Sequence, residues 1–280
     1  MTTHFPWQVL EARLRRRDAA FDGGHVAWRS LGDGPPLVLL HGGHGSWAHW
    51  SRNIEALSSD FSVWVADLPG YGDSSLPVAA TLDALVEALQ QSLDTLLGAR
   101  VPILLGGFSF GGLVAAHLAA RRGDVRALAL LGAAGHGGAR RPRGELLAWR
   151  EAWEGRDAAA LRSIMRSNLE RHMLAGPAGE EAVAIHTQAC VHTRFQSKRI
   201  SLSGGLQTVL ASLPCPQWLL WGEHDVTATP EVLVPELAAR LGGAEAQILP
   251  GAGHWVQYEA ADRVNPLLAD WLRAQDRAVP

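Results

Sequence analysis

The sequence predicts an α/β fold with a mostly parallel, doubly wound sheet and helices on both faces. Short apolar runs recur along the chain and each ends in a turn, at residues 37–40, 63–66, 103–105, 127–131, 218–221 and 247–249. Runs without polar alternation suit strands that are buried on both faces, as in parallel sheets. Helical patterns lie between these runs, at residues 47–57, 81–97, 110–121, 230–241 and 260–273. Strands and helices that alternate in this way are typical of a doubly wound sheet.

Chemically reactive side chains follow the predicted strands. They are His41, Asp67, Ser109, Asp225 and His254. The carboxyl ends of parallel strands meet at one edge of a sheet, where ligands bind in open α/β folds. We therefore expect a functional site at this edge.

The strand rhythm stops between about residues 137 and 205, where three amphipathic helical patterns replace it. The apolar stripes are Leu146, Trp149 and Trp153, then Leu161, Ile164, Met165 and Leu169, and a weaker one of Val183, Thr187 and Cys190. Ordinary core helices are the alternative, but the position between two core strands favours a helical lid. We predict a core domain of residues 1–136 and 206–280 with a lid insertion at 137–205. The first twenty or so residues fit either a helix or an edge strand.

Composition narrows the class of protein. The chain has 280 residues, 47% of them hydrophobic, and a net charge of −3, which gives no electrostatic footprint for nucleic acid. Two cysteines, Cys190 and Cys215, make no disulfide framework. The N-terminus lacks the pattern of a signal peptide, and no apolar run reaches the length of a membrane span. We expect a soluble, cytoplasmic protein with a small-molecule substrate and no nucleic-acid or membrane partner; a homodimer is left open.

The segment Gly107-Phe108-Ser109-Phe110-Gly111 reads G-x-S-x-G between a strand-like run and a helix-like run. A serine on so tight a strand-to-helix turn adopts a strained backbone, and its side chain stands clear of the sheet. Glycines on either side leave room where the backbone folds back on itself. The bare motif also occurs as an ordinary turn, but this context favours Ser109 as a nucleophile.

A serine nucleophile needs a base and a carboxylate that orients it. His254 follows the last core strand in a Gly-rich turn, and Asp225 follows the strand before it. Asp67 also follows a strand and is a second candidate for the carboxylate. We do not assign it this role, because an aspartate that opens Asp-Leu-Pro-Gly usually stabilises the turn. We predict the catalytic triad Ser109, Asp225 and His254.

An oxyanion hole needs two N–H donors, for which we expect the amides of Phe110 and Gly43. His41, His44 and His49 have no zinc-type spacing, so no metal is predicted. Glycine-rich nucleotide motifs are also missing from the sequence, so no cofactor is expected.

With these residues, the chain resembles the α/β-hydrolase superfamily over nearly its full length. The matching segments are 41–43, 67–74, 107–112, 222–225 and 253–255. The resemblance implies the α/β-hydrolase fold and the chain order Ser109, Asp225, His254. Since position 109 is serine, the chain does not resemble the dehalogenases and epoxide hydrolases, which carry aspartate there.

Two subfamilies are candidates. Residues 253–259 with Asn265 look like the meta-cleavage-product hydrolases, which break a C–C bond in vinylogous diketo acids. In that case Arg194 or Arg199 of the lid would meet the substrate carboxylate. That group typically has asparagine where this chain has Phe108, whereas carboxylesterases of the superfamily accept phenylalanine there.

We therefore expect a lidded serine hydrolase that cleaves a small, largely apolar carboxylic ester through an acyl-enzyme. The alternatives are C–C bond hydrolysis and a receptor that binds a small ligand with at most one turnover. The residues expected to line the substrate pocket are Gly42, His44, Phe108, Trp149, Trp153, Arg194 and Trp255.

Overall fold

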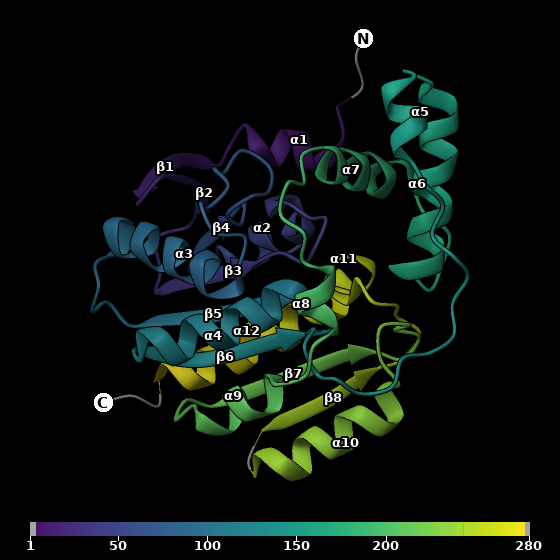
Figure 1. Ribbon diagram of the computed structural model, residues 1–280. Coiled ribbons are helices and arrows are strands. Elements are labelled where there is room, and N and C mark those ends of the chain that lie inside the picture. Colours follow the sequence, from purple (N-terminus) through teal and green to yellow (C-terminus); the bar gives the residue numbers. More distant parts are fainter. Residues whose placement is uncertain (1–3, 243, 278–280) are drawn as a thin grey trace.

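The computed structural model describes residues 4–242 and 244–277, and these form a sheet between two layers of helices (Figure 1). Within this part of the chain the sheet has eight strands in the order β1-β2-β4-β3-β5-β6-β7-β8. Their bounds are β1 Arg15–Phe21, β2 Gly24–Leu31, β3 Pro36–Leu40, β4 Ser62–Ala66, β5 Ile103–Phe108, β6 Val125–Leu131, β7 Gln217–Gly222 and β8 Glu245–Leu249. Only β2 runs against its neighbours β1 and β4, and the other described pairs are parallel.

The helices are α1 Pro6–Glu11, a 3-10 turn η1 Trp47–Trp50, α2 Ile54–Leu57, α3 Leu82–Leu97, α4 Phe110–Arg122, α5 Arg150–Glu154, α6 Ala158–His172, α7 Glu180–Val191, α8 Lys198–Leu202, α9 Leu206–Ser212, α10 Pro230–Leu241, α11 Val256–Glu259 and α12 Ala261–Arg277. Helices α3, α4, α9 and α10 cover one face of the sheet, whereas α2 and α12 cover the other (Figure 1). No described helix is long and apolar enough to cross a membrane.

Strand β3 shows why unbroken apolar runs form this sheet. Leu37 and Leu39 pack toward α2 and α12, and the alternate residues Val38 and Leu40 pack toward α3 and α4. All four side chains are fully buried. A strand with helices on both faces needs apolar residues at every position, which is the pattern found in the sequence.

The α/β fold class and the six predicted strands are confirmed, and the N-terminal segment contains both alternatives, helix α1 and then edge strand β1. The helix predicted at residues 47–57 is wrong. Ser46 caps η1 through Ala48, and Asn53 then turns its side-chain amide to the Gln257 carbonyl (2.8 Å) and to Asn265 (2.7 Å). These contacts break the segment into η1 and α2.

Helices α5 to α8 interrupt the strand rhythm between β6 and β7, beside the edge to which the parallel strands point (Figure 1). Helix α5 is shorter than the sequence predicts, so Leu146 and Trp149 precede it. The segment is tied back to the core where the Arg194 and Phe195 amides donate to the Gly70 carbonyl (2.9 and 3.1 Å). Its role as a lid stays a prediction.

Candidate active site

Ser109 occupies a strained turn between β5 and α4. Its backbone has φ 53° and ψ −119°, outside the regions that a non-glycine residue ordinarily adopts. A Cβ on Gly107 would lie 2.4 Å from the Gly111 carbonyl oxygen, and one on Gly111 would lie 2.3 Å from that of His41. Only glycine fits at either position, so the turn can pass close to the neighbouring loop and present the serine hydroxyl at the sheet edge.

His254 reaches both predicted partners. Its Nε2 lies 2.9 Å from Ser109 Oγ, and its Nδ1 lies 2.7 Å from Asp225 Oδ2. His254 is 3% exposed and Asp225 is fully buried. Because Nδ1–H donates to the carboxylate, Nε2 is the lone-pair nitrogen that accepts from the serine hydroxyl. The three side chains form the relay that serine hydrolases use to activate a hydroxyl.

Thr227 completes the environment of Asp225. Its backbone N–H (2.7 Å) and its hydroxyl (2.8 Å) both donate to Asp225 Oδ1. Burial opposes ionisation of Asp225, but His254 and Thr227 outweigh it and hold the pKa of this carboxyl below its usual range. Thr227 was not among the residues predicted from the sequence, although an aspartate followed two residues later by threonine is a signal of such a turn.

Glu259 fixes the loop that carries His254. One carboxylate oxygen accepts from the amides of Ala175 (2.8 Å) and Gly176 (2.9 Å) after α6, and the other accepts from Gly253 (2.7 Å). A single side chain thereby joins the segment between β6 and β7 to the residue that precedes His254.

The predicted oxyanion loop lies against the nucleophile. A Cβ on Gly42 would be 3.0 Å from Ser109 Cβ, so the loop backbone passes directly beside the serine. Phe110 begins α4, and its N–H therefore has no partner within the helix. A Cβ on Gly43 would lie 2.7 Å from Ser197 Oγ, so Ser197 also packs against this loop. The sequence carried no signal for Ser197.

His41 supports this loop from below. Its Nδ1–H donates to the Gly42 carbonyl (2.7 Å), and its Nε2 accepts from the Leu68 amide (2.9 Å). Burial lowers the pKa of His41 to about 4, against a smaller opposing effect of Asp67. The ring is therefore neutral, and its two nitrogens join the Gly42 loop to the turn at Leu68.

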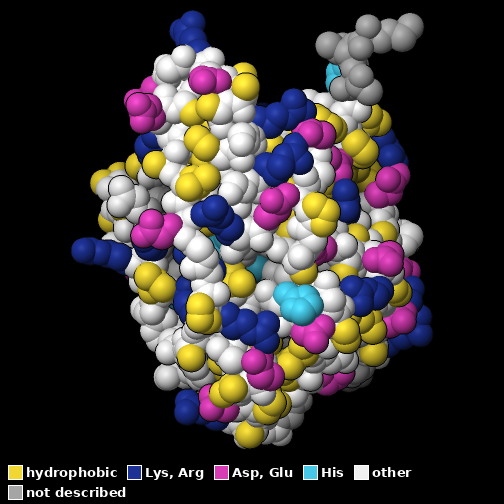
Figure 2. All heavy atoms as spheres, turned by 90° about the vertical axis from the view of Figure 1, so that its right-hand side faces the viewer, with side chains coloured by type: hydrophobic (Ala, Val, Ile, Leu, Met, Phe, Trp, Pro, Cys, Tyr) yellow, Lys and Arg dark blue, Asp and Glu magenta, His cyan; other side chains and the backbone are white. Residues whose placement is uncertain are grey.

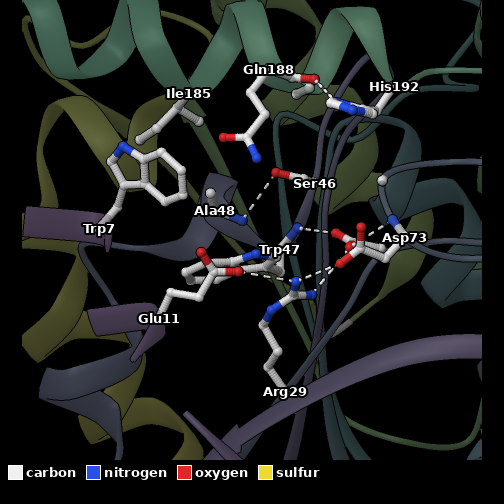
Figure 3. A pocket seen from close by; sticks show the side chains of 13 residues that line it. Trp7, Glu11, Arg29, Ser46, Trp47, Ala48, Asp73, Ile185, Gln188 and His192 are labelled. Carbon is white, nitrogen blue, oxygen red and sulfur yellow. Dashed lines mark hydrogen bonds and ion pairs between the residues drawn. The ribbon is translucent and has the colours of Figure 1, made fainter. Parts of the chain in front are cut away.

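A buried arginine anchors the far end of the loop (Figure 3). Arg29 is 4% exposed, contacts Asp67 (3.1 Å), Asp73 (2.9 Å) and Glu11 (3.1 Å), and lies over the Trp47 ring at 5.1 Å. Asp67 accepts from the Trp47 amide (2.9 Å), so it ties down its turn as predicted from its Asp-Leu-Pro-Gly context. This network borders a small cavity of about 100 Å³ that is separate from the triad. The sequence offered no sign of Arg29.

Two predicted pocket residues support the triad from inside the core. Phe108 and Trp255 are fully buried. The Phe108 ring lies 4.9 Å from that of His254, and Trp255 donates through Nε1 to the His49 carbonyl (3.0 Å). Trp255 also stacks on Tyr258 at 4.0 Å. Gly42 borders Ser109, and His44 follows in the same loop with φ 52°.

Three other predicted pocket residues have different surroundings. Trp153 is half exposed and lines an apolar groove with Leu161 and Val183, a groove whose lining includes neither Ser109 nor His254. The α6–α7 surface thus draws Trp153 away from the triad, which corrects its predicted place. Trp149 packs partly buried beneath Arg150.

Arg194 donates to the carbonyls of Gly72 (3.2 Å) and Ser74. Its guanidinium therefore holds a core loop, although we predicted that it faces the substrate. Arg199 is exposed on α8.

The edge that holds the triad lies on the side of the molecule that faces the viewer in Figure 2. This face is hollowed near its centre, and histidine side chains are visible inside the hollow (Figure 2). Among the described residues, no group of three or more His, Cys, Asp or Glu side chains is placed to hold a metal ion.

A strained serine at a strand-to-helix turn, in contact with a buried His–Asp pair, is the arrangement that characterises α/β hydrolases. Comparison with known proteins agrees. Residues 37–267 match the model of the alpha/beta hydrolase family. The chain belongs to this family and is an enzyme of the hydrolase type.

Two relatives extend over most of the chain. It is 32% identical to the dihydrolipoyllysine-residue acetyltransferase component of the acetoin cleaving system of Pseudomonas putida, over 91% of this chain and 68% of that protein. It is 30% identical to the pimeloyl-[acyl-carrier protein] methyl ester esterase of Chromobacterium violaceum, over 80% of this chain and 89% of that protein.

Solved structures share the fold. The carboxylesterase CesB of Bacillus subtilis superposes with a TM-score of 0.75 at 21% identity, covering 95% of each chain. The meta-cleavage product hydrolase of Pseudomonas fluorescens superposes with a TM-score of 0.71 at 23% identity, covering 92% of this chain and 97% of the other. At these identities the two structures show a shared fold, which a carboxylesterase and a meta-cleavage product hydrolase both have.

Proposed function

We propose that this protein hydrolyses a small, largely apolar carboxylic ester through an acyl-enzyme on Ser109. The observation that carries the proposal is the unbroken relay of two short contacts, from Ser109 Oγ to His254 Nε2 (2.9 Å) and from His254 Nδ1 to Asp225 (2.7 Å). The 30% identity to a methyl ester esterase supports an ester as the bond that is cleaved.

The first half-reaction forms the acyl-enzyme. Ser109 Oγ attacks the ester carbonyl carbon while His254 Nε2 takes the hydroxyl proton. Asp225 holds the imidazole in the required tautomer and stabilises the imidazolium. The amides of Gly43 and Phe110 donate to the oxyanion, which also lies at the positive end of the α4 dipole. When the tetrahedral intermediate collapses, the C–O bond to the alcohol breaks and His254 Nε2 returns its proton to the leaving oxygen.

The second half-reaction releases the acid. Water attacks the acyl carbon while His254 Nε2 takes one of its protons, and the same oxyanion donors serve again. Collapse of this intermediate breaks the bond to Ser109 Oγ, which regains the proton from His254. One ester and one water yield one acid and one alcohol.

Ser109→Ala tests the nucleophile. Because the substitution removes the attacking oxygen, kcat/KM for p-nitrophenyl butyrate should fall by at least about a thousandfold, with the fold retained by circular dichroism. The exposed residue Ser59, whose hydroxyl donates to the Ala56 carbonyl, provides Ser59→Ala as a matched control that keeps full activity. A loss of less than about tenfold for Ser109→Ala would refute the assignment.

The same assay separates the alternatives. An ester hydrolase gives steady multiple turnover, whereas a receptor releases one equivalent of p-nitrophenolate and stops. A vinylogous diketo acid, assayed beside the ester, reports C–C bond cleavage. Preference for the diketo acid by more than about tenfold in kcat/KM would overturn the proposal in favour of C–C hydrolysis.

A further inference from the structure

Two histidines outside the triad lie beside it. His49 comes from η1, and its ring lies 4.8 Å from that of Trp255 and 5.5 Å from that of Phe108. His172 ends α6, and its ring lies 5.8 Å from that of His254. One histidine therefore belongs to the core and the other to the segment between β6 and β7, and both approach the same site.

The protonation of His49 follows from its contacts. The ring is fully buried, and burial lowers its pKa well below the usual value, so it is neutral. The Gly42 amide donates to Nδ1 (3.3 Å), which makes Nδ1 the lone-pair nitrogen. The single ring proton is consequently on Nε2.

That N–H group has no hydrogen-bond acceptor within residues 4–242 and 244–277. Nε2 of His49 is buried without a hydrogen-bond partner among the described residues, and so is Nδ1 of His172. Buried polar atoms are nearly always paired, because leaving one unpaired forfeits its hydration. Other buried atoms of the described residues are also unpaired, but these two belong to rings that approach the triad, where a bound substrate would supply a partner.

Carboxylates are few among the titratable groups that act on the two histidines. Those that act on His49 are His41, His44, His186 and His254. Those around His172 are His254, Arg143, Asp225 and His186. Asp225 is the one carboxylate among the groups named for the two histidines. Its oxygens already accept hydrogen bonds from His254 and Thr227.

We propose that His49 and His172 form a polar subsite, in which His49 Nε2–H donates to a second oxygen atom of the substrate. The inference rests on the proposed ester hydrolysis and narrows its substrate. The preferred ester carries an oxygen acceptor, such as an ether, hydroxyl or carbonyl group, within a few atoms of the scissile carbonyl. The remainder of the substrate is apolar.

The test compares isosteric esters that differ in one oxygen. On the acyl side the pair is p-nitrophenyl methoxyacetate and p-nitrophenyl butyrate, and on the alcohol side it is 2-methoxyethyl butyrate and butyl butyrate, followed by pH-stat. The measured quantity is the ratio of kcat/KM for the ether ester to that for the alkyl ester. Dividing the wild-type ratio by that of a variant cancels the intrinsic reactivity of the esters.

His49→Phe removes the donor and should lower this ratio by about tenfold for at least one pair, which corresponds to about 1.4 kcal/mol. His49→Gln, whose amide can accept from Gly42 and donate from the position of Nε2, should keep it. His172→Phe should lower the ratio for the same pair, and it leaves the oxyanion loop untouched if His49→Phe does not fold. His117→Phe, on the outer side of α4, is the matched control and should change nothing.

A ratio within twofold of wild type in both His49→Phe and His172→Phe, for both pairs, overturns the subsite. A general loss that affects ether and alkyl esters equally also contradicts it, because it shows a merely structural role. If wild type hydrolyses neither member of either pair, the proposed function itself fails, an outcome distinct from failure of the subsite.

Discussion

At the scale of single residues, the site depends on close approaches that only particular side chains permit. Ser109 stands between backbone segments that touch, and Gly42 borders it without a Cβ. Thr227 and His41 then use hydrogen bonds to hold Asp225 and the loop at Gly42 in place. The strain at Ser109 is thus maintained by its surroundings, as is usual at functional sites.

Gly43→Ala tests the contact between the oxyanion loop and Ser197. The new methyl group would lie 2.7 Å from Ser197 Oγ, so the loop must shift and its amide must move away from the oxyanion. Loss of one oxyanion donor typically lowers kcat by about a hundredfold or more. We expect a loss of about 10 to 100-fold with p-nitrophenyl butyrate, since the loop shifts without losing the amide.

Ser197→Ala supplies the matched rescue. The Ser197 Cβ lies 3.8 Å from the same position, an ordinary contact, so removal of Oγ alone makes room for the methyl group. The double variant should regain most of the activity lost in Gly43→Ala. If Gly43→Ala is fully active, or if the double variant is no better than the single one, the steric explanation is wrong.

At the scale of elements, hydrogen bonds and an ion pair join the loops at the carboxyl ends of the strands to one another. The Arg29 network ties the start of η1 to the turn after β4. Glu259, from α11, joins the turn after α6 to the loop after β8. The turns at the sheet edge are therefore held by Arg29 from β2 and by Glu259 from α11.

Glu259→Ala tests this linkage. It leaves three backbone amides without their carboxylate acceptor, and hydrogen bonds to a charged group contribute about 1.5–3 kcal/mol each at most. Since water replaces part of the loss at the exposed Ala175 amide, we expect a net cost of about 2 kcal/mol and a melting temperature lower by about 4–8 °C. We also expect kcat to fall severalfold, because Gly253 precedes His254. Differential scanning calorimetry and the p-nitrophenyl butyrate assay measure the two effects.

Glu259→Gln keeps one oxygen acceptor and should lie between wild type and Glu259→Ala in both measurements. An unchanged melting temperature in Glu259→Ala would show that water replaces the carboxylate without cost. A lower melting temperature with unchanged kcat would show that the His254 loop holds itself in place.

At the scale of the whole molecule, the sequence predicted what local patterns determine. Unbroken apolar runs identify strands buried on both faces, and the convergence of their carboxyl ends brought Ser109, Asp225 and His254 together. Arg29, Ser197 and His172 escaped prediction because their partners lie far away in the chain and only tertiary packing joins them. Trp153 was misplaced because helical spacing identifies a stripe but not the surface that the stripe covers.

The free energy of unfolding of the whole molecule also depends on pH, because several histidines are buried. Burial is the main cause that lowers the pKa of His41 to about 4, of His172 to about 3 and of His186 to about 4. In the unfolded chain each titrates near 6.5. At a pH between the folded and unfolded pKa values, these histidines are protonated in the unfolded state but not in the folded state. The free energy of unfolding therefore falls as the pH falls from about 6.5 toward 4.

We therefore expect the melting temperature to be flat from pH 8 to 7 and to drop by more than about 5 °C between pH 7 and 5. Carboxylates such as Asp225, whose pKa is lowered from about 3.8, lose their stabilising effect only at lower pH and do not contribute in this window. His186→Gln removes one of the three groups and should make the decline shallower, whereas replacement of the exposed His192 should not. A melting temperature that is constant down to pH 5, or a slope that His186→Gln leaves unchanged, would contradict the argument that neutral, buried imidazoles set the acid limit of this fold.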